Sequence, residues 1–191
     1  MKPNDYIKLD GNLVCLVRIP KNASRSMAQA LGLHLPGAHK PAAMLKEQNQ
    51  RKFKDAVAVA CVRNPFERMV SWYEFHVGRY PVLYPSHGID AFRQWVAKGC
   101  PHRFWMGHWA SHPFEQWRWI CDEFGEVLVD HVLHHDTLGR DWSAIFPDIE
   151  LKEVNQSNHG DWRVYYDKTT ADRVATLVHS DLMFFGYGRP L

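Results

Sequence analysis

The segment "IPKNASRSM", residues 19–27, combines one lysine with small and hydroxyl side chains. Small residues let an anion approach backbone N–H groups, and the positive end of a helix dipole favours an anion at a helix start. Lys21 adds a compact positive charge, and Ser24 and Ser26 add hydroxyl donors. The pattern suits a phosphate or sulfate ester, although an ordinary strand-to-helix turn with a surface lysine has the same composition.

A second cationic segment, "VRNPFERMVSWY", spans residues 62–73. Arg63 stands at its start and Ser71 follows eight residues later, while Arg68 is three residues before Ser71 and so shares a helix side with it. A guanidinium fork beside a hydroxyl is suited to a terminal phosphate. An ion pair between Arg68 and a nearby carboxylate is the alternative interpretation.

The hydrophobic patterning predicts strands that alternate with helices. We expect strands at residues 13–19, 56–62 and 126–133. We expect helices at residues 25–33 with Ser24 as N-cap, 41–54, from Pro65 with Asn64 as N-cap, 89–98, 137–146 and 169–182. This alternation predicts an α/β fold with a parallel sheet, in which ligands bind at the carboxyl ends of the strands. Both cationic segments follow predicted strands, so they are expected at one edge of the sheet.

Composition narrows the class of protein. The 191 residues predict one domain, 1–191, and 23 basic against 21 acidic residues give a net charge of +2, which argues against a nucleic-acid partner. The four cysteines show no CxxC spacing and predict reduced, buried thiols: Cys15, Cys61, Cys100 and Cys121. No signal peptide and no run of about 18 apolar residues is visible, so we expect a cytoplasmic protein with no membrane partner.

The two cationic segments together resemble the PAPS-dependent sulfotransferases, most closely the carbohydrate type, sulfotransferase family 2. "WICDEFGEVLVDHVL", "VNQSNHGDWRVYYD" and "SDLMFFGYG" extend the resemblance over most of the chain. It implies a P-loop-NTPase-like three-layer fold with a central parallel sheet flanked by helices. The Walker A pattern GxxxxGK[ST] is missing, which argues against a nucleoside triphosphate with magnesium.

The resemblance also implies roles for individual residues. Lys21 would be catalytic and stabilise the oxygen that bridges sulfate and nucleotide, with PAPS as sulfuryl donor, PAP as product and no metal. The residues implied to hold the nucleotide are Lys21, Asn22, Ala23, Ser24, Arg25, Ser26, Arg63, Arg68, Ser71, Asn155 and Ser157. Arg25 departs from the family, which more often has threonine or another small residue there.

A base is needed for the acceptor hydroxyl, and a histidine or a carboxylate suits this role. Related enzymes place a histidine in the interval that contains His39, which is therefore our first candidate. His34 and Glu47 are the alternatives. We expect the acceptor to be a carbohydrate or small-molecule hydroxyl. The competing functions are a P-loop-like nucleotide kinase and a non-catalytic nucleotide-binding module.

Overall fold

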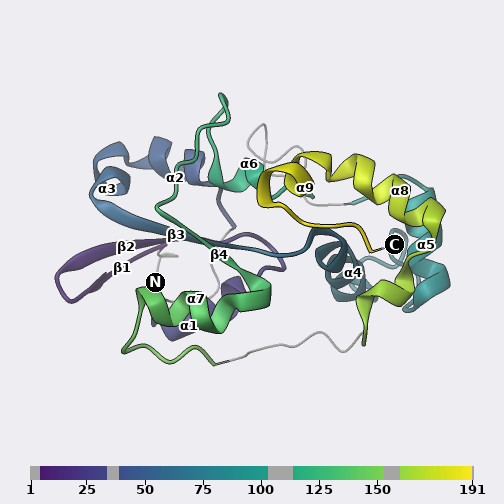
Figure 1. Cartoon of the computed structure of the whole chain (residues 1–191), viewed down its shortest axis with the longest axis horizontal. Helices are drawn as coiled ribbons and strands as arrows, with labels where there is room; N and C mark the ends of the chain where they lie inside the picture. Colours follow the sequence, from purple (N-terminus) through teal and green to yellow (C-terminus); the bar gives the residue numbers. More distant parts are fainter. Residues whose placement is uncertain (1–4, 34–38, 103–113, 153–159, 191) are drawn as a thin grey trace. The chain divides into compact units, whose positions relative to one another are not determined.

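The computed structural model describes residues 5–33, 39–102, 114–152 and 160–190 (Figure 1). The chain forms two compact units. Of the described residues, the first unit comprises 5–33, 39–63 and 116–152, and the second comprises 64–102, 114–115 and 160–190.

A four-stranded sheet of order β1-β2-β3-β4 forms the centre of the first unit. Its strands are β1 (Tyr6–Leu9), β2 (Asn12–Val17), β3 (Ala56–Val62) and β4 (His131–His134). The pairs β2–β3 and β3–β4 are parallel, which confirms the prediction of a parallel α/β sheet. β1, which the sequence analysis missed, pairs antiparallel with β2.

Helices cover both faces of this sheet (Figure 1). One face carries α1 (Ser24–Ala30) and α7 (Leu138–Ile145), and the other carries α2 (Ala42–Gln48) and α3 (Gln50–Lys54). The core against α1 and α7 includes Leu16, Met27, Val59, Leu133 and Trp142. The first unit therefore has the three layers that the resemblance to sulfotransferases implied. Its remaining described elements are α6 (Trp117–Ile120) and the 3-10 helix η1 (His135–Thr137).

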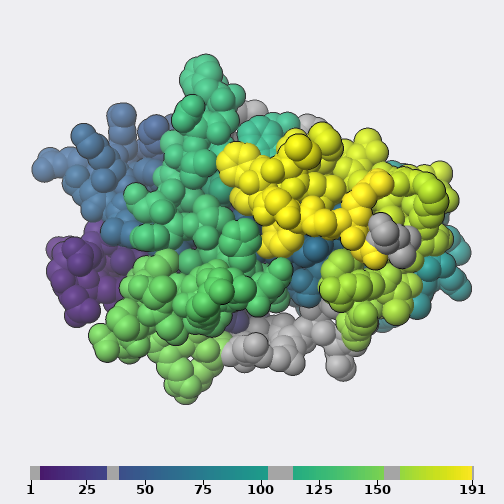
Figure 2. All heavy atoms as spheres, in the orientation of Figure 1, coloured from purple at the N-terminus to yellow at the C-terminus, as the bar shows by residue number. Residues whose placement is uncertain are grey.

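Several predicted boundaries were wrong in the first unit. The helix predicted at 41–54 is broken at Asn49, whose extended backbone ends α2 and whose side chain accepts a hydrogen bond from Lys52 N and caps α3. The strand predicted at 126–133 begins only at His131, because Val127 instead forms an isolated bridge with Cys121. The turn between Cys121 and Val127 is the green projection at the top of Figure 2, and it exposes Phe124.

The second unit is helical around an aromatic core. Its elements are α4 (Pro65–His76), α5 (Ile89–Ala97), the 3-10 helix η2 (Trp162–Tyr165), α8 (Lys168–Leu177) and α9 (His179–Phe185). The helix predicted at 169–182 is thus divided at Val178. The largest core side chains are Phe66, Trp72, Tyr73, Tyr84, Phe92 and Trp95. These aromatic side chains give the described part of the second unit a core packed between helices.

Asn64 caps α4 as predicted, because its side-chain oxygen accepts hydrogen bonds from Phe66 N at 3.0 Å and Glu67 N at 3.4 Å. Pro65 occupies the first helical position. This cap starts the helix immediately after Arg63 and so fixes where the second cationic segment becomes helical.

All four cysteines are free and buried, as predicted. Burial raises the pKa of the Cys15 and Cys100 thiols to about 12, so both are protonated at neutral pH. Within the described residues, no helix has the length and apolar character that crossing a membrane requires.

Asp167 caps α8, and its replacement tests the helix start. Its carboxylate accepts a hydrogen bond from Thr170 N at 2.8 Å, which holds its pKa below the usual value. We expect Asp167→Ala to lower the free energy of unfolding by about 1 kcal/mol at pH 7 in urea denaturation. A lowered folded-state pKa means that the charge-dependent stabilisation is present above about pH 4 and is lost as pH falls through the lowered pKa.

The difference in unfolding free energy between wild type and Asp167→Ala should therefore shrink in acid. Asp167→Asn is the matched control, since it keeps a capping oxygen without a titrating charge. Equal unfolding free energies for wild type and Asp167→Ala at pH 7 would show that this cap contributes nothing.

Candidate functional site

Lys21 and Arg63 follow the carboxyl ends of the neighbouring strands β2 and β3 in the first unit. β2 and β3 are parallel, with Val17 opposite Ala60, so the segments that follow the two strands leave the sheet at the same edge. Arg63 Nη1 donates a hydrogen bond to the Lys21 carbonyl at 3.3 Å. The structure therefore brings the segment 19–27, which we call the lysine loop, next to Arg63, as the sequence predicted.

The backbone of the lysine loop is strained in a way that suits anion binding. Lys21 has a φ of 68° and Ala23 a φ of 51°, both in the left-handed region that non-glycine residues avoid. Such strain is concentrated at functional sites. Because Ala23 is left-handed and Ser24 is helical, successive backbone N–H groups converge in the concave arrangement that binds anions. The loop thus offers amide donors beside Lys21.

Ala23, and not Ser24, is the N-cap residue of α1. The prediction of Ser24 was wrong by one position, because the left-handed turn at Ala23 makes Ser24 the first helical residue. Ala23 has no side chain that could cap the helix. Ser24 and Ser26 are buried in the first turn, while Arg25 is exposed.

Asn22 anchors the loop to the sheet. Its side chain is fully buried, and its Nδ2 donates to the carbonyl of Cys61 at 2.9 Å. Cys61 is the second-last residue of β3, so this bond holds the lysine loop against the strand that ends next to Arg63. Asn22 therefore has a structural role beside its predicted nucleotide contact.

His39, the candidate base, is held at the end of β2. Its Nδ1 lies 2.9 Å from the carbonyl oxygen of Arg18, three residues before Lys21. A carbonyl can only accept, so Nδ1 carries a proton, and in the neutral ring Nε2 is then the nitrogen that can act as a base. The ring is half-buried and packs edge-on to Trp119 with centroids 6.5 Å apart. Glu47 is exposed on α2, and His34 lies outside the described residues.

A buried ion network supports this strand end. Asp5 accepts hydrogen bonds from Arg18 Nη2 at 2.6 Å and from Lys40 Nζ at 2.9 Å. The Asp5 and Arg18 side chains are 5% and 3% exposed, so water screens their attraction little. The network fixes Arg18 and Lys40, which precede the lysine loop and follow His39 respectively. Sequence analysis missed it, because Asp5 lies outside every predicted element.

Arg68 and Ser71 lie on α4 in the second unit, and each is 1% exposed. Arg68 Nη1 donates to the Phe114 carbonyl at 3.0 Å, which gives it a structural role within this unit. Arg63 and Ser71 belong to different units, so their joint binding of one phosphate stays a prediction. Asn155 and Ser157 lie outside the described residues.

Gln116 is the residue at this edge that sequence reasoning overlooked. It is fully buried and hydrogen bonds to both Asn22 and the main chain of Arg63. It lies 53 residues after Arg63 in the chain, and no motif marks it.

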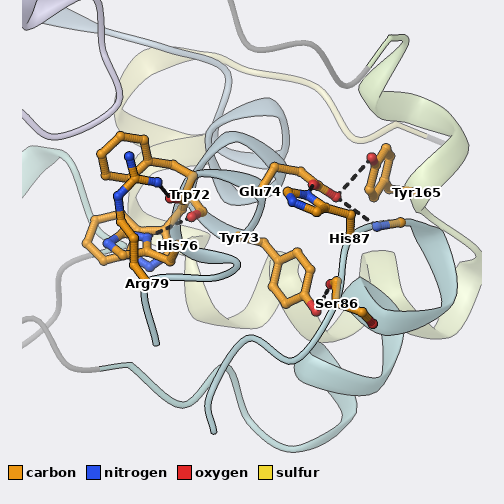
Figure 3. A network of polar contacts seen from close by, with 10 residues as sticks. Trp72, Tyr73, Glu74, His76, Arg79, Ser86, His87 and Tyr165 are labelled. Atoms are coloured by element: carbon orange, nitrogen blue, oxygen red, sulfur yellow. Dashed lines mark hydrogen bonds and ion pairs between the residues drawn. The ribbon is translucent and has the colours of Figure 1, made fainter. Parts of the chain in front are cut away.

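The second unit contains a separate polar network, shown in Figure 3. Glu74 contacts His87 and accepts hydrogen bonds from Gly88 N and the Tyr165 hydroxyl, each at 3.1 Å. A cavity of about 600 Å³ adjoins it, lined by residues 85–91, Gln94, Val164 and Tyr165. No predicted site residue lines this cavity. Glu74 thus joins the segment before α5 to η2, which is a structural role within this unit.

Comparison with known proteins gives one positive result. The model of the sulfotransferase family matches residues 6–187, which is nearly the whole chain. Neither the curated proteins nor the solved structures include a match to this chain.

Proposed function

The chain belongs to the sulfotransferase family, and from that premise we propose that it transfers a sulfuryl group from PAPS to an acceptor hydroxyl. The acceptor we propose is a carbohydrate or a small metabolite. The observation that carries the proposal is the hydrogen bond of 3.3 Å between Arg63 Nη1 and the Lys21 carbonyl. It supports one continuous cationic edge that could hold both phosphate groups of a single nucleotide.

The donor set at this edge fits an anionic ester. Lys21 supplies an ammonium group, and the left-handed turn at Ala23 presents backbone amides with the hydroxyls of Ser24 and Ser26 nearby in sequence. These groups would hold the 5′-phosphosulfate end. Arg63, with Arg68 and Ser71 as predicted partners, would hold the 3′-phosphate. PAPS, when bound, supplies the sulfuryl group and a nucleotide leaving group.

Two side chains would assist the transfer itself. Lys21 would stabilise the negative charge that develops on the bridging oxygen, where a fixed cation has its largest effect. His39 would accept the proton of the acceptor hydroxyl at Nε2, since its Nδ1 donates to the Arg18 carbonyl. Lys21 follows β2 in the chain, and His39 is hydrogen bonded to Arg18 at the end of the same strand. This supports their acting on one reaction centre.

Calorimetry and turnover test this proposal together. In calorimetry, we expect the wild-type chain to bind PAP more tightly than magnesium-ATP. In a turnover assay, we expect it to transfer labelled sulfate from PAPS to members of a panel of carbohydrate and small hydroxyl acceptors. Preference for magnesium-ATP would favour the kinase alternative. PAP binding without turnover on any acceptor would favour the non-catalytic module.

Arg63→Ala is expected to weaken PAP binding by about 10- to 150-fold, the equivalent of about 1.5–3 kcal/mol for a charged hydrogen bond. Calorimetry gives the dissociation constant, and a thermal melt checks that the variant folds. An unchanged dissociation constant would reject a role for Arg63 in nucleotide binding.

A further inference from the structure

The side-chain amide of Gln116 binds the main chain of Arg63 as a neighbouring strand would. Gln116 Nε2 donates to the Arg63 carbonyl at 2.8 Å, and Gln116 Oε1 accepts from Arg63 N at 2.9 Å. Gln116 is fully buried, so these bonds have no competition from water. Arg63 is the first residue beyond β3, where the regular ladder has ended. Gln116 thus fixes the backbone of Arg63 and with it the base of the Arg63 side chain.

The same oxygen of Gln116 also binds the lysine loop. Asn22 Nδ2 donates to Gln116 Oε1 at 2.6 Å and to the Cys61 carbonyl at 2.9 Å. The two bonds to the Arg63 main chain fix which end of the Gln116 amide is oxygen. Asn22 must therefore present its amide nitrogen, as it does. These hydrogen bonds join the loop beside Lys21 to the strand end at Arg63.

We propose that Gln116 is a positioning residue that fixes the spacing between two half-sites. The lysine loop forms the half-site for the 5′-phosphate, and Arg63 forms the half-site for the 3′-phosphate. This inference rests on the proposed function, because it assumes that the two half-sites hold one nucleotide. A ligand that contacts both half-sites depends on their spacing, whereas a ligand with one phosphate does not. Loss of Gln116 should therefore weaken PAP far more than AMP, which lacks the 3′-phosphate.

The test uses Gln116→Met, which keeps the side-chain length and removes the hydrogen bonds to Asn22 and to the Arg63 main chain. We expect calorimetry to show about a tenfold weaker affinity for PAP and less than about a threefold change for AMP. In an Arg63→Ala background, Gln116→Met should leave the ratio of the PAP and AMP affinities unchanged, because the spacing no longer matters.

Trp142→Phe is the matched control. It removes one partly buried hydrogen bond of the same unit, from Trp142 Nε1 to the Ile149 carbonyl at 2.8 Å. This variant should lower the melting temperature but keep the wild-type ratio of PAP to AMP affinity. If Gln116→Met does not fold, Gln116→Asn, whose amide is one methylene shorter, gives the same readout.

The outcomes separate the two proposals. If Gln116→Met weakens the affinities for PAP and AMP equally, or leaves the PAP affinity unchanged, the positioning role is wrong. In either case, a wild-type chain that prefers PAP over AMP would leave the proposed function intact. A wild-type chain that binds neither nucleotide would instead overturn the proposed function and the inference that rests on it.

Discussion

His39→Ala should lower the turnover number for sulfuryl transfer by about 10²- to 10⁴-fold and leave PAP binding intact. The reason is the hydrogen bond from His39 Nδ1 to the Arg18 carbonyl, 2.9 Å long, which makes Nε2 the nitrogen of the neutral ring that would accept the proton of the acceptor hydroxyl. Steady-state kinetics with labelled PAPS gives the turnover number, and calorimetry with PAP gives the affinity.

Two controls make this result specific. His131→Ala removes an exposed histidine of β4 and should leave turnover unchanged. Glu47→Ala removes the competing carboxylate, which is exposed on α2, and should also have little effect. Full activity of His39→Ala, or a large loss in Glu47→Ala, would move the base away from His39.

Lys21→Ala should reduce the turnover number by about 10²- to 10³-fold, the range for loss of one donor that stabilises developing negative charge. PAP should still bind, because the backbone amides near Ala23 and the Arg63 guanidinium hold its phosphates in our proposal. Kinetics and calorimetry on the same preparation separate the two effects. The expected pattern is a change in catalysis without a comparable change in product affinity.

Lys21→Arg is the informative companion variant, since it keeps the charge but replaces a compact ammonium with a planar group. It should recover part of the activity lost in Lys21→Ala. If Lys21→Ala loses PAP binding and turnover by the same factor, Lys21 acts in nucleotide binding and its catalytic role is wrong.

The sequence predicted the parts of the fold whose signals are local. β3 was predicted with its observed bounds, because "AVAVACV" is a short apolar run between polar segments. The start of α4 was predicted because Asn64 and Pro65 have preferences that depend only on the adjacent backbone. The adjacency of Lys21 and Arg63 followed from parallel strand order, and the hydrogen bond between them confirms it.

Two features of the first unit were not predicted, and they differ in kind. β1 is local and had a readable signal in the turn of Asp10 and Gly11, whose φ values of 47° and 85° are those a tight hairpin turn needs. Gln116 had none, since its role comes from a buried position beside Asn22 and Arg63 that only the folded chain creates. Side chains recruited across 50 or more residues leave no spacing pattern to find.

The central claim is that the strand ends at Lys21 and Arg63 hold one nucleotide between them. A thermodynamic cycle measures this most directly: calorimetric affinities of PAP and AMP for the wild type and for Arg63→Ala. We expect wild type to prefer PAP over AMP by about 10- to 150-fold and Arg63→Ala to lose most of that preference. If Arg63→Ala weakens both nucleotides equally, or neither, Arg63 does not bind the 3′-phosphate and the claim is wrong.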